Sequence, residues 1–205
     1  MLHTWLAMVN TLEPKTYTSK MFTTEFLGKQ DHYRYGDWLK DQDTETQQLY
    51  FGVVGGAGLI ERLMDSIEVA PDQHEILVAQ NCNGWLGTVH IAKINTTTVE
   101  FGIIVHTDYR GEGIGNAMLE EAIVWARNRN YSELFMHCLG YNKPIQHLCQ
   151  KHGLLPRSIM GDSEVNIHLN PPSWVTIASE VGIKQRNVYH AFLQKSQLLY
   201  QEIYG

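Results

Sequence analysis

Cysteine and long apolar runs are both scarce in this 205-residue sequence. Its three cysteines, Cys82, Cys138 and Cys149, form no C-x-x-C pair. An odd number without paired spacing does not indicate a disulfide framework, so we expect a protein of the reducing cytoplasm. No run reaches the roughly 18 apolar residues that a membrane-spanning helix needs. The N-terminal stretch MLHTWLAMVN lacks a basic region and a small-residue cleavage site, so we expect no secretory signal.

Positive charge is also in short supply. The chain has 16 Lys and Arg against 22 Asp and Glu, a net charge of −6 with the histidines neutral. Such a surface offers no general electrostatic attraction to nucleic acids or anionic membranes, and it suits a basic substrate such as an amine better. The length and the 43% hydrophobic content are those of one globular domain with room for a small appendage.

Hydrophobic periodicity predicts an alternation of strands and helices. From residue 75 onward, three consecutive strands form an antiparallel meander, and a helix, a strand, a short helix and a last strand follow. The expected ranges are 76–80, 85–94 and 98–105 for the meander, then 116–128, 134–139, 144–152 and 165–169. Before the meander we expect a strand over 21–27, helices over 31–42 and 59–67, and a loop packed on the core over 49–54.

The breaker Asn170-Pro171-Pro172 is the best candidate for a domain boundary. It divides the chain into a domain of residues 1–170 and a C-terminal helical extension of residues 171–205. Within the extension we expect two helical stretches, about 174–181 and 184–204, with Gly182 between them.

One segment joins a predicted strand to a predicted helix through three glycines within five residues. It runs from Val105 to Asn116 and reads VHTDYRGEGIGN. Glycine lets the backbone approach a ligand closely, and the first amides of a helix bind phosphate oxygens. The spacing is not that of a dinucleotide-binding βαβ unit, and no Gly-Lys-Ser/Thr follows to make a P-loop. The junction therefore predicts a different kind of phosphate-binding corner.

Two sequence blocks make this corner more specific. The pattern [QR]-x-x-G-x-[GA] stands at Arg110 to Gly115, and a second block follows with the strand 134–139, Asn142 and the helix exit Lys151-x-Gly153-Leu154. In these blocks the sequence resembles the GNAT family of acyl-CoA-dependent acyltransferases. The resemblance covers roughly residues 20–170 in the order of elements.

The resemblance implies a fold, a cofactor and its binding residues. The fold is α/β, with a mixed, mostly antiparallel sheet of six to seven strands flanked by helices. The strand ending at Val105 should splay from the strand 134–139, and acetyl-CoA should lie in that slot without a metal. An amide near Val105 would polarise the thioester carbonyl. The implied contacts are Ile103, Ile104 and Val105 for the pantetheine arm, Arg110, Gly111, Glu112, Gly113, Ile114, Gly115 and Asn116 at the pyrophosphate loop, and Asn142.

Acetyl transfer to an amine also needs a base and gains from an acid. Glu100 and His137 lie where different family members carry a base. Each has an equally good structural interpretation: Glu100 as a charge on a strand face at the rim of the site, and His137 as a core histidine bonded to the backbone. The family's usual tyrosine acid, seven residues after Asn142, is here Cys149. A thiol can donate a proton, although Cys149 also fits as a small hydrophobic residue on its helix, and Tyr141 is a nearby substitute.

The sequence thus predicts an N-acetyltransferase that moves an acetyl group directly from acetyl-CoA to a primary amine and works as a homodimer. The identity of the amine stays open. A set of aromatic residues either lines the acceptor site or packs in the core: Tyr33, Tyr35, Trp38, Tyr50 and Phe51. One alternative function is a CoA-binding sensor without turnover.

A second alternative concerns the C-terminal extension. Residues 177–199 resemble the helix-turn-helix of TetR-type repressors, with Gly182 at the turn. The segment lacks the preceding helix and carries only Lys184, Arg186 and Lys195 as cations, so we do not expect a nucleic-acid partner. The other interpretation is a helical pair that caps the core or forms a dimer contact.

Overall fold

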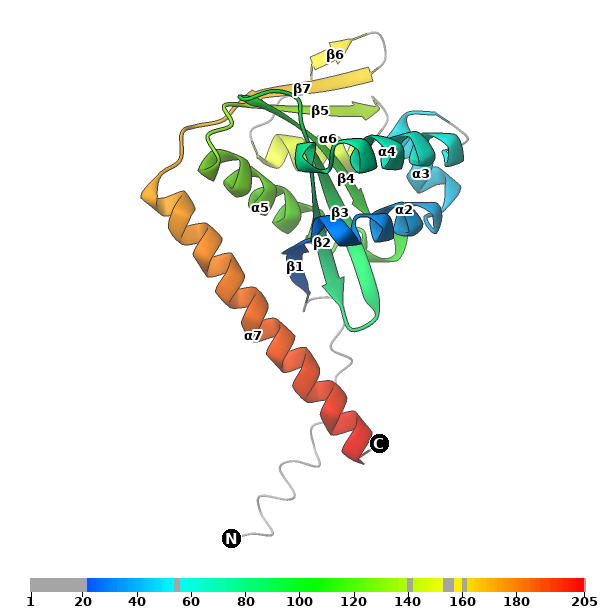
Figure 1. Cartoon of the computed structure of the whole chain (residues 1–205), viewed down its shortest axis with the longest axis vertical. Helices are drawn as coiled ribbons and strands as arrows, with labels where there is room; N and C mark the ends of the chain where they lie inside the picture. The colour runs from blue at the N-terminus through cyan, green and yellow to red at the C-terminus, as the bar shows by residue number, and fades with distance from the viewer. Residues whose placement is uncertain (1–21, 54–55, 140–141, 153–156, 160–161, 205) are drawn as a thin grey trace.

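A seven-stranded mixed sheet forms the centre of the protein, with strand order β1-β2-β3-β4-β5-β7-β6 (Figure 1). The computed structural model describes residues 22–53, 56–139, 142–152, 157–159 and 162–204. All neighbouring strands are antiparallel except β4 and β5, which are parallel, so the expected mixed, mostly antiparallel sheet is confirmed. The strands are β1 Thr23–Phe26, β2 His74–Asn81, β3 Gly84–Lys93, β4 Thr98–Val105, β5 Glu133–Leu139, β6 Arg157–Ile159 and β7 Asp162–His168.

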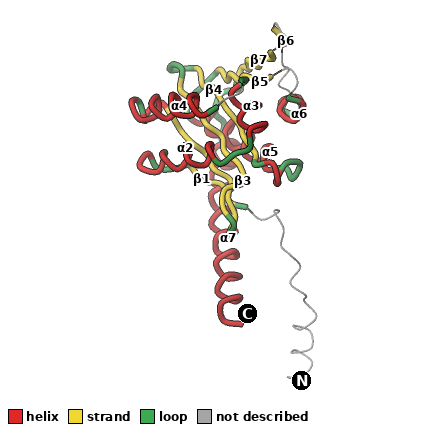
Figure 2. The backbone as a smooth tube through the Cα atoms, turned by 90° about the vertical axis from the view of Figure 1, so that its right-hand side faces the viewer, coloured by secondary structure: helices red, strands yellow, loops and turns green. Residues whose placement is uncertain are grey.

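Helices cover both faces of this sheet (Figure 2). The helices α2 Tyr33–Lys40, α3 Thr44–Phe51 and α4 Ala57–Val69 pack on one face, and α5 Ile114–Asn128 and α6 Lys143–Lys151 pack on the other. Short 3-10 turns lie at Lys29–Asp31, Pro71–Gln73 and Thr107–Tyr109. None of the helices in the described ranges has the length and apolarity to cross a bilayer.

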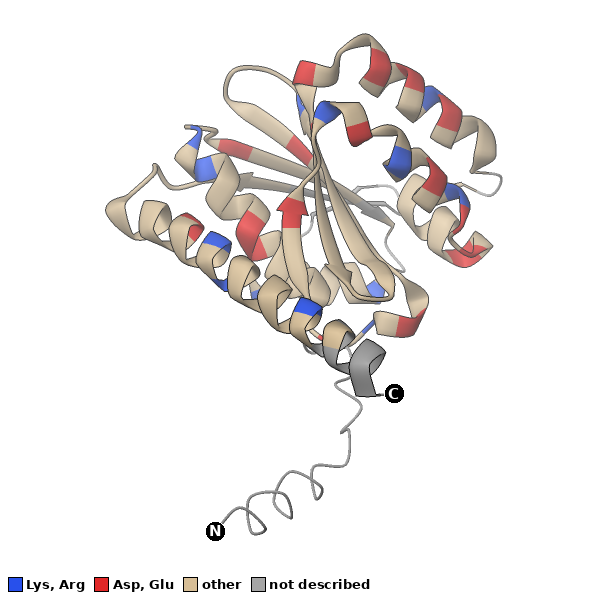
Figure 3. Cartoon of the chain, turned by 60° about the horizontal axis from the view of Figure 1, so that its bottom comes forward, with Lys and Arg blue, Asp and Glu red and all other residues tan. Residues whose placement is uncertain are grey.

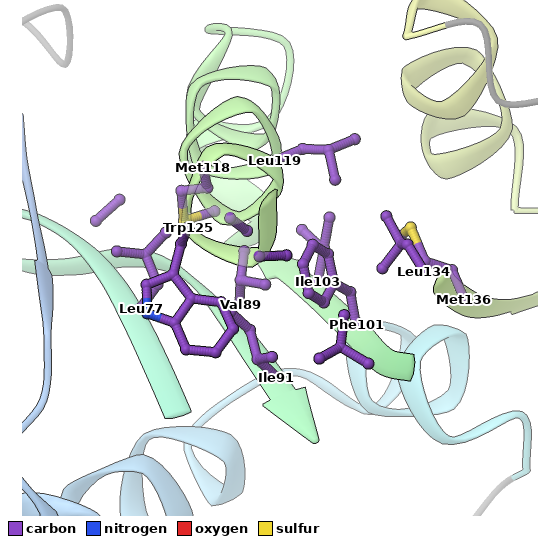
Figure 4. Packing of buried hydrophobic residues seen from close by; sticks show 14 of the residues in the cluster. Leu77, Val89, Ile91, Phe101, Ile103, Met118, Leu119, Trp125, Leu134 and Met136 are labelled. Atoms are coloured by element: carbon purple, nitrogen blue, oxygen red, sulfur yellow. The ribbon is translucent and has the colours of Figure 1, made fainter. Parts of the chain in front are cut away.

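Strand alternation divides the core into two layers. Phe101 and Ile103 of β4 point toward α5, where they pack with Met118 and Trp125 (Figure 4). Ile104 points the other way and packs in the layer beneath α2 and α4. The face of any residue on β4 therefore decides which helices it meets.

The segment that includes the start of the expected loop over 49–54 folds as helix α3. The Asp43 side chain accepts a hydrogen bond from the amide of Thr46 at 2.8 Å and caps the helix. Gly52, with φ of 79°, ends it in the left-handed conformation. The prediction of a loop over 49–54 is therefore wrong at Leu49, Tyr50 and Phe51, because it overlooked the Asp cap at the start and the Gly at the end.

The C-terminal extension is one continuous helix, α7, from Trp174 to Tyr204 (Figure 1). The predicted break at Gly182 and the helix-turn-helix interpretation are both wrong. A glycine inside a helix costs only about 1 kcal/mol relative to alanine. Contacts on either side offset this cost, because Glu180 accepts a hydrogen bond from Asn128 of α5 at 2.7 Å and Asn187 donates one to the Thr24 carbonyl of β1 at 2.7 Å.

Candidate active site

The sheet opens between its two parallel strands. β4 and β5 are paired only at Thr98–Glu133, Val99–Leu134 and Glu100–Phe135, although both strands continue well beyond these residues. β5 remains paired with β7 along its whole length. The divergence expected between the two strands is therefore present, and Glu100 stands at the point where it begins.

A cavity of about 360 Å³ lies on the β4 side of this opening, lined by the end of β4 and by residues of α3 and α6, and it extends to the glycine-rich loop after β4. Several hundred Å³ is the usual size of a small-molecule site. The residues that line it include every predicted CoA contact except Glu112, which is exposed. The predicted contacts that line it are Ile103, Ile104, Val105, Arg110, Gly111, Gly113, Ile114, Gly115, Asn116 and Asn142.

The glycine-rich loop has the shape of an anion cradle. Gly111 and Gly113 adopt φ of 81° and 85°, and a Cβ atom built on either glycine would meet nothing within 4 Å. The positive φ angles therefore explain why glycine stands at both positions, and the space in front of the loop is open. The first hydrogen bond of α5 runs from the amide of Ala117 to the carbonyl of Gly113, at 3.0 Å. The three preceding amides have no partner inside the helix and are suited to hold phosphate oxygens.

Arg110 ties this loop to α3. Its Nε donates to the Val105 carbonyl at 3.3 Å, and its guanidinium donates to the Thr46 hydroxyl. Thr46 in turn holds Asp43, and the Thr46 hydrogen bonds, aided by the Arg110 charge, lower the pKa of the Asp43 carboxyl. The Arg110 side chain therefore fixes the wall of the cavity, while α3 becomes a part of the site.

The predicted catalytic residues lie in three different settings, and none of them lines the cavity. Glu100 is half-buried at the fork, on the sheet face covered by α3. His137 is exposed on β5, with its ring edge-on to Phe135 at 4.5 Å between centroids. Cys149 is fully buried with the core residues beneath α5, which accords with its interpretation as a small hydrophobic residue.

Asn142 has a structural task as well as a place in the cavity wall. It is the N-cap of α6, and its Oδ1 accepts a hydrogen bond from the Ile145 amide at 3.3 Å. Its side chain is buried, so it positions the start of α6 against the slot.

Tyr50 is the one member of the predicted aromatic set that lines the cavity. Its hydroxyl lies over Gly102 of β4, where an added Cβ would come within 2.5 Å of that oxygen, and it is 2.9 Å from the hydroxyl of Tyr35. Desolvation, with a contribution from the Glu100 charge, raises the pKa of Tyr50 to about 12. The hydroxyl therefore stays protonated at neutral pH and can donate a hydrogen bond.

Three of the remaining aromatic residues pack in the core and the fourth lies at the surface. Tyr35 is fully buried, Trp38 and Phe51 pack in the same layer, and Tyr33 is largely exposed. The sequence analysis did not single out Gly102, although a glycine inside a strand often marks the close approach of another group.

Comparisons with known proteins agree with this geometry. The model of the acetyltransferase (GNAT) family matches residues 15–154. "Putative phosphinothricin acetyltransferase YwnH" of Bacillus subtilis (strain 168) is 31% identical over 88 residues, which are 40% of this chain. The chain spans only about half, 54%, of that relative's length.

Solved structures share the fold at low sequence identity. The GNAT domain of S. lividans PAT has a TM-score of 0.59 at 17% identity, over 71% of this chain and 89% of that chain. Spermidine N-acetyltransferase from Vibrio cholerae, solved with CoA and spermine, has a TM-score of 0.55 at 16% identity, over 74% of this chain and 97% of that chain. The resemblance inferred from the sequence is confirmed, and the chain belongs to the acetyltransferase (GNAT) family.

Proposed function

We propose that this protein transfers an acetyl group from acetyl-CoA to a primary amine. The observation that carries the proposal is the slot that opens after Glu100 between β4 and β5 and ends at the amides after Gly113. An extended thioester with a phosphate group at its far end fits such a slot, because apolar side chains of β4, α3 and α6 line the walls and the glycine-rich loop presents backbone donors.

The chain would hold acetyl-CoA mainly through its backbone. The loop from Gly111 to Asn116 would bind the pyrophosphate, and Ile103, Ile104 and Val105 would flank the pantetheine arm. Acetyl-CoA supplies an activated acyl group on a thiolate leaving group. In the reaction a C–N bond forms, the C–S bond breaks, and the amine gives up a proton.

We assign the proton-accepting role to Glu100. Its carboxylate lies at the mouth of the fork, on the face where Tyr50 is, and its charge reaches the Tyr50 hydroxyl. His137 is the second candidate base, because it stands on the same sheet face two residues beyond the last paired position of β5. The pH–rate profiles of Glu100→Gln and His137→Ala test the two proposals. Substitution of the true base must shift or abolish the acidic limb of the profile.

We assign hydrogen-bond donation from the wall of the slot to Tyr50, in place of the proposed acid Cys149. Tyr50 lines the cavity, whereas the Cys149 side chain is enclosed by the core. A tyrosine pKa of about 12 makes full proton transfer to a thiolate uphill, so its proposed role is to donate a hydrogen bond to the negative charge that develops there.

The acceptor is proposed to be a small primary amine. The chain is similar to proteins whose names specify phosphinothricin and spermidine, an amino acid analogue and a polyamine. A panel should contain both compounds, proteinogenic amino acids and a lysine peptide. We propose that the enzyme acts in the cytoplasm and as a homodimer.

The decisive experiment measures free CoA thiol released from acetyl-CoA in the presence of each acceptor. Release that depends on one acceptor class, and that Glu100→Gln reduces while calorimetry shows unchanged CoA binding, supports the proposal. Tight CoA binding with no release by any acceptor would favour the CoA sensor. Failure of CoA and acetyl-CoA to bind at millimolar concentration would refute both functions.

A further inference from the structure

Helix α7 carries a stripe of large apolar side chains that the described part of the chain leaves exposed. At 100° per residue, the six members fall within an arc of about 60° along roughly 37 Å of helix. Each has about half or more of its surface exposed, with 81% for Trp174, 72% for Val188 and 67% for Phe192. The α7 stripe consists of Trp174, Ile177, Val181, Val188, Phe192 and Leu199.

A different face of α7 holds the helix on the body of the protein. Asn187 bonds Thr24, His190 bonds the Phe22 carbonyl at 3.2 Å, and Glu180 pairs with Arg129 at 3.4 Å. The C-terminal part of α7 extends past β1, beyond the edge of the sheet (Figure 1, Figure 3). The α7 stripe therefore faces away from the molecule along the whole helix, including the part that projects.

We propose that the α7 stripe is the contact surface between two copies of this chain, which pack their helices antiparallel around a twofold axis level with residue 190. The spacing of the stripe carries this assignment. Val181 and Leu199 lie nine residues on either side of that point, and Val188 and Phe192 lie two residues on either side. Reversal of the helix direction therefore places Val181 opposite Leu199 and Val188 opposite Phe192, apolar against apolar.

Charge selects the antiparallel arrangement over a parallel one. Lys195 lies eighteen residues after Ile177, five full turns, and so at the same angular position as the stripe. A parallel pair would place Lys195 opposite Lys195 of the second copy. It would also place Lys184, at the border of the stripe, opposite Lys184 of the second copy. The antiparallel pair sets these lysines opposite Gln185 and Ser196, which carry no charge.

The area of the contact suits a weak, reversible dimer. From the exposed fractions and ordinary residue areas, the four residues that this register pairs leave on the order of 450 Å² accessible per copy, about half of the roughly 800 Å² per partner of a standard interface. The contact is separate from the acetyl-transfer site, because no residue of α7 lines the cavity. The inference extends the proposed homodimer and does not depend on the proposed chemistry.

Analytical ultracentrifugation of the full chain, from micromolar to hundreds of micromolar concentration, tests the contact. We expect a reversible dimer. Val188→Asp and Phe192→Glu should each weaken it by at least about 100-fold, because each substitution occurs twice in a symmetric interface. Val175→Asp is the matched control, since Val175 is 50% exposed on α7 but lies outside the stripe, and it should leave the dimer unchanged.

A charge-pair rescue then tests the antiparallel direction. Val181→Glu and Leu199→Lys should each break the dimer alone, and the double variant should restore it. The two side chains are about 27 Å apart along one helix, so they cannot pair within a copy. A monomer at the highest concentration, a dimer that Val188→Asp leaves intact, a failed rescue, or a monomer that binds anionic phosphatidylserine vesicles through the α7 stripe would each overturn the proposal. The acceptor panel is read separately on the same variants, so loss of the dimer and loss of activity are distinguished.

Discussion

A pair of stacked histidines makes the stability of the fold depend on pH. The His74 Nδ1 and His90 Nε2 atoms are 2.9 Å apart, and the rings stack at 5.1 Å between centroids. Burial first, and then the charges of His74 and His32, lower the pKa of His90 to about 3. Burial is also the main cause of the lowered pKa values of His74 and His32.

The sign of the effect follows from proton binding. Below pH 6.5 the unfolded chain protonates these histidines more fully than the folded chain does, because folding lowers their pKa, so the free energy of unfolding falls as the pH decreases. For His90 alone the loss between pH 7 and pH 5 is about 2 kcal/mol, from about 1.4 kcal/mol for each pH unit below 6.5. The loss continues to about pH 3, where folded His90 begins to bind its proton.

Urea unfolding of His90→Gln at pH 7 and pH 5 measures this contribution. The variant should lose about 2 kcal/mol less than the wild type between the two pH values, even if its stability at pH 7 is lower. His168→Gln is the control, because His168 lies at the surface with its side chain 73% exposed, and it should behave like the wild type. An equal loss in His90→Gln and the wild type would refute the reasoning.

Four further substitutions test the fold and the site. Gly182→Ala should raise the free energy of unfolding by about 0.5–1 kcal/mol in a urea titration, because α7 is continuous there, and a decrease would indicate a turn. Gly113→Ala should weaken CoA binding in calorimetry by about ten-fold or more, since the φ of 85° costs an L-residue about 1–2 kcal/mol and the cradle must rearrange. Asp43→Ala should cost about 1 kcal/mol of stability through the lost cap of α3. Tyr50→Phe should lower kcat by about ten-fold or more with unchanged CoA affinity, and an unchanged kcat would exclude Tyr50 from the reaction.

The glycine-rich corner was predictable because its determinants are local. Three glycines between a strand and a helix specify backbone conformation and a helix N-terminus within a few residues, so Gly111 and Gly113 are found where the sequence implied. The same holds for the meander, whose alternation and tight turns are contained in about thirty residues.

The parts that the sequence did not reveal depend on contacts between distant residues. α7 continues through Gly182 because Asn128 and Thr24 hold it on either side. The burial of Cys149 depends on the packing of α6 against the α5 layer, which the spacing within α6 leaves undecided. Tyr50 enters the site because its hydroxyl fits over Gly102 and reaches Tyr35, three positions that no local pattern connects.

The position of Glu100 follows from the topology of the sheet. A parallel pair of strands that stays hydrogen-bonded along its whole length has no room for a ligand, and here β5 keeps its full pairing with β7 while it leaves β4 after Phe135. The last residue of β4 that pairs with β5, Glu100, is therefore held between β3 and β5 at the point where the opening begins. Gly102, two residues further, lets the Tyr50 hydroxyl approach the strand from α3. A carboxylate and a protonated hydroxyl thus lie on the same face of β4, and the proposed chemistry would use the first to remove a proton from an amine and the second to stabilise the charge on a leaving thiolate.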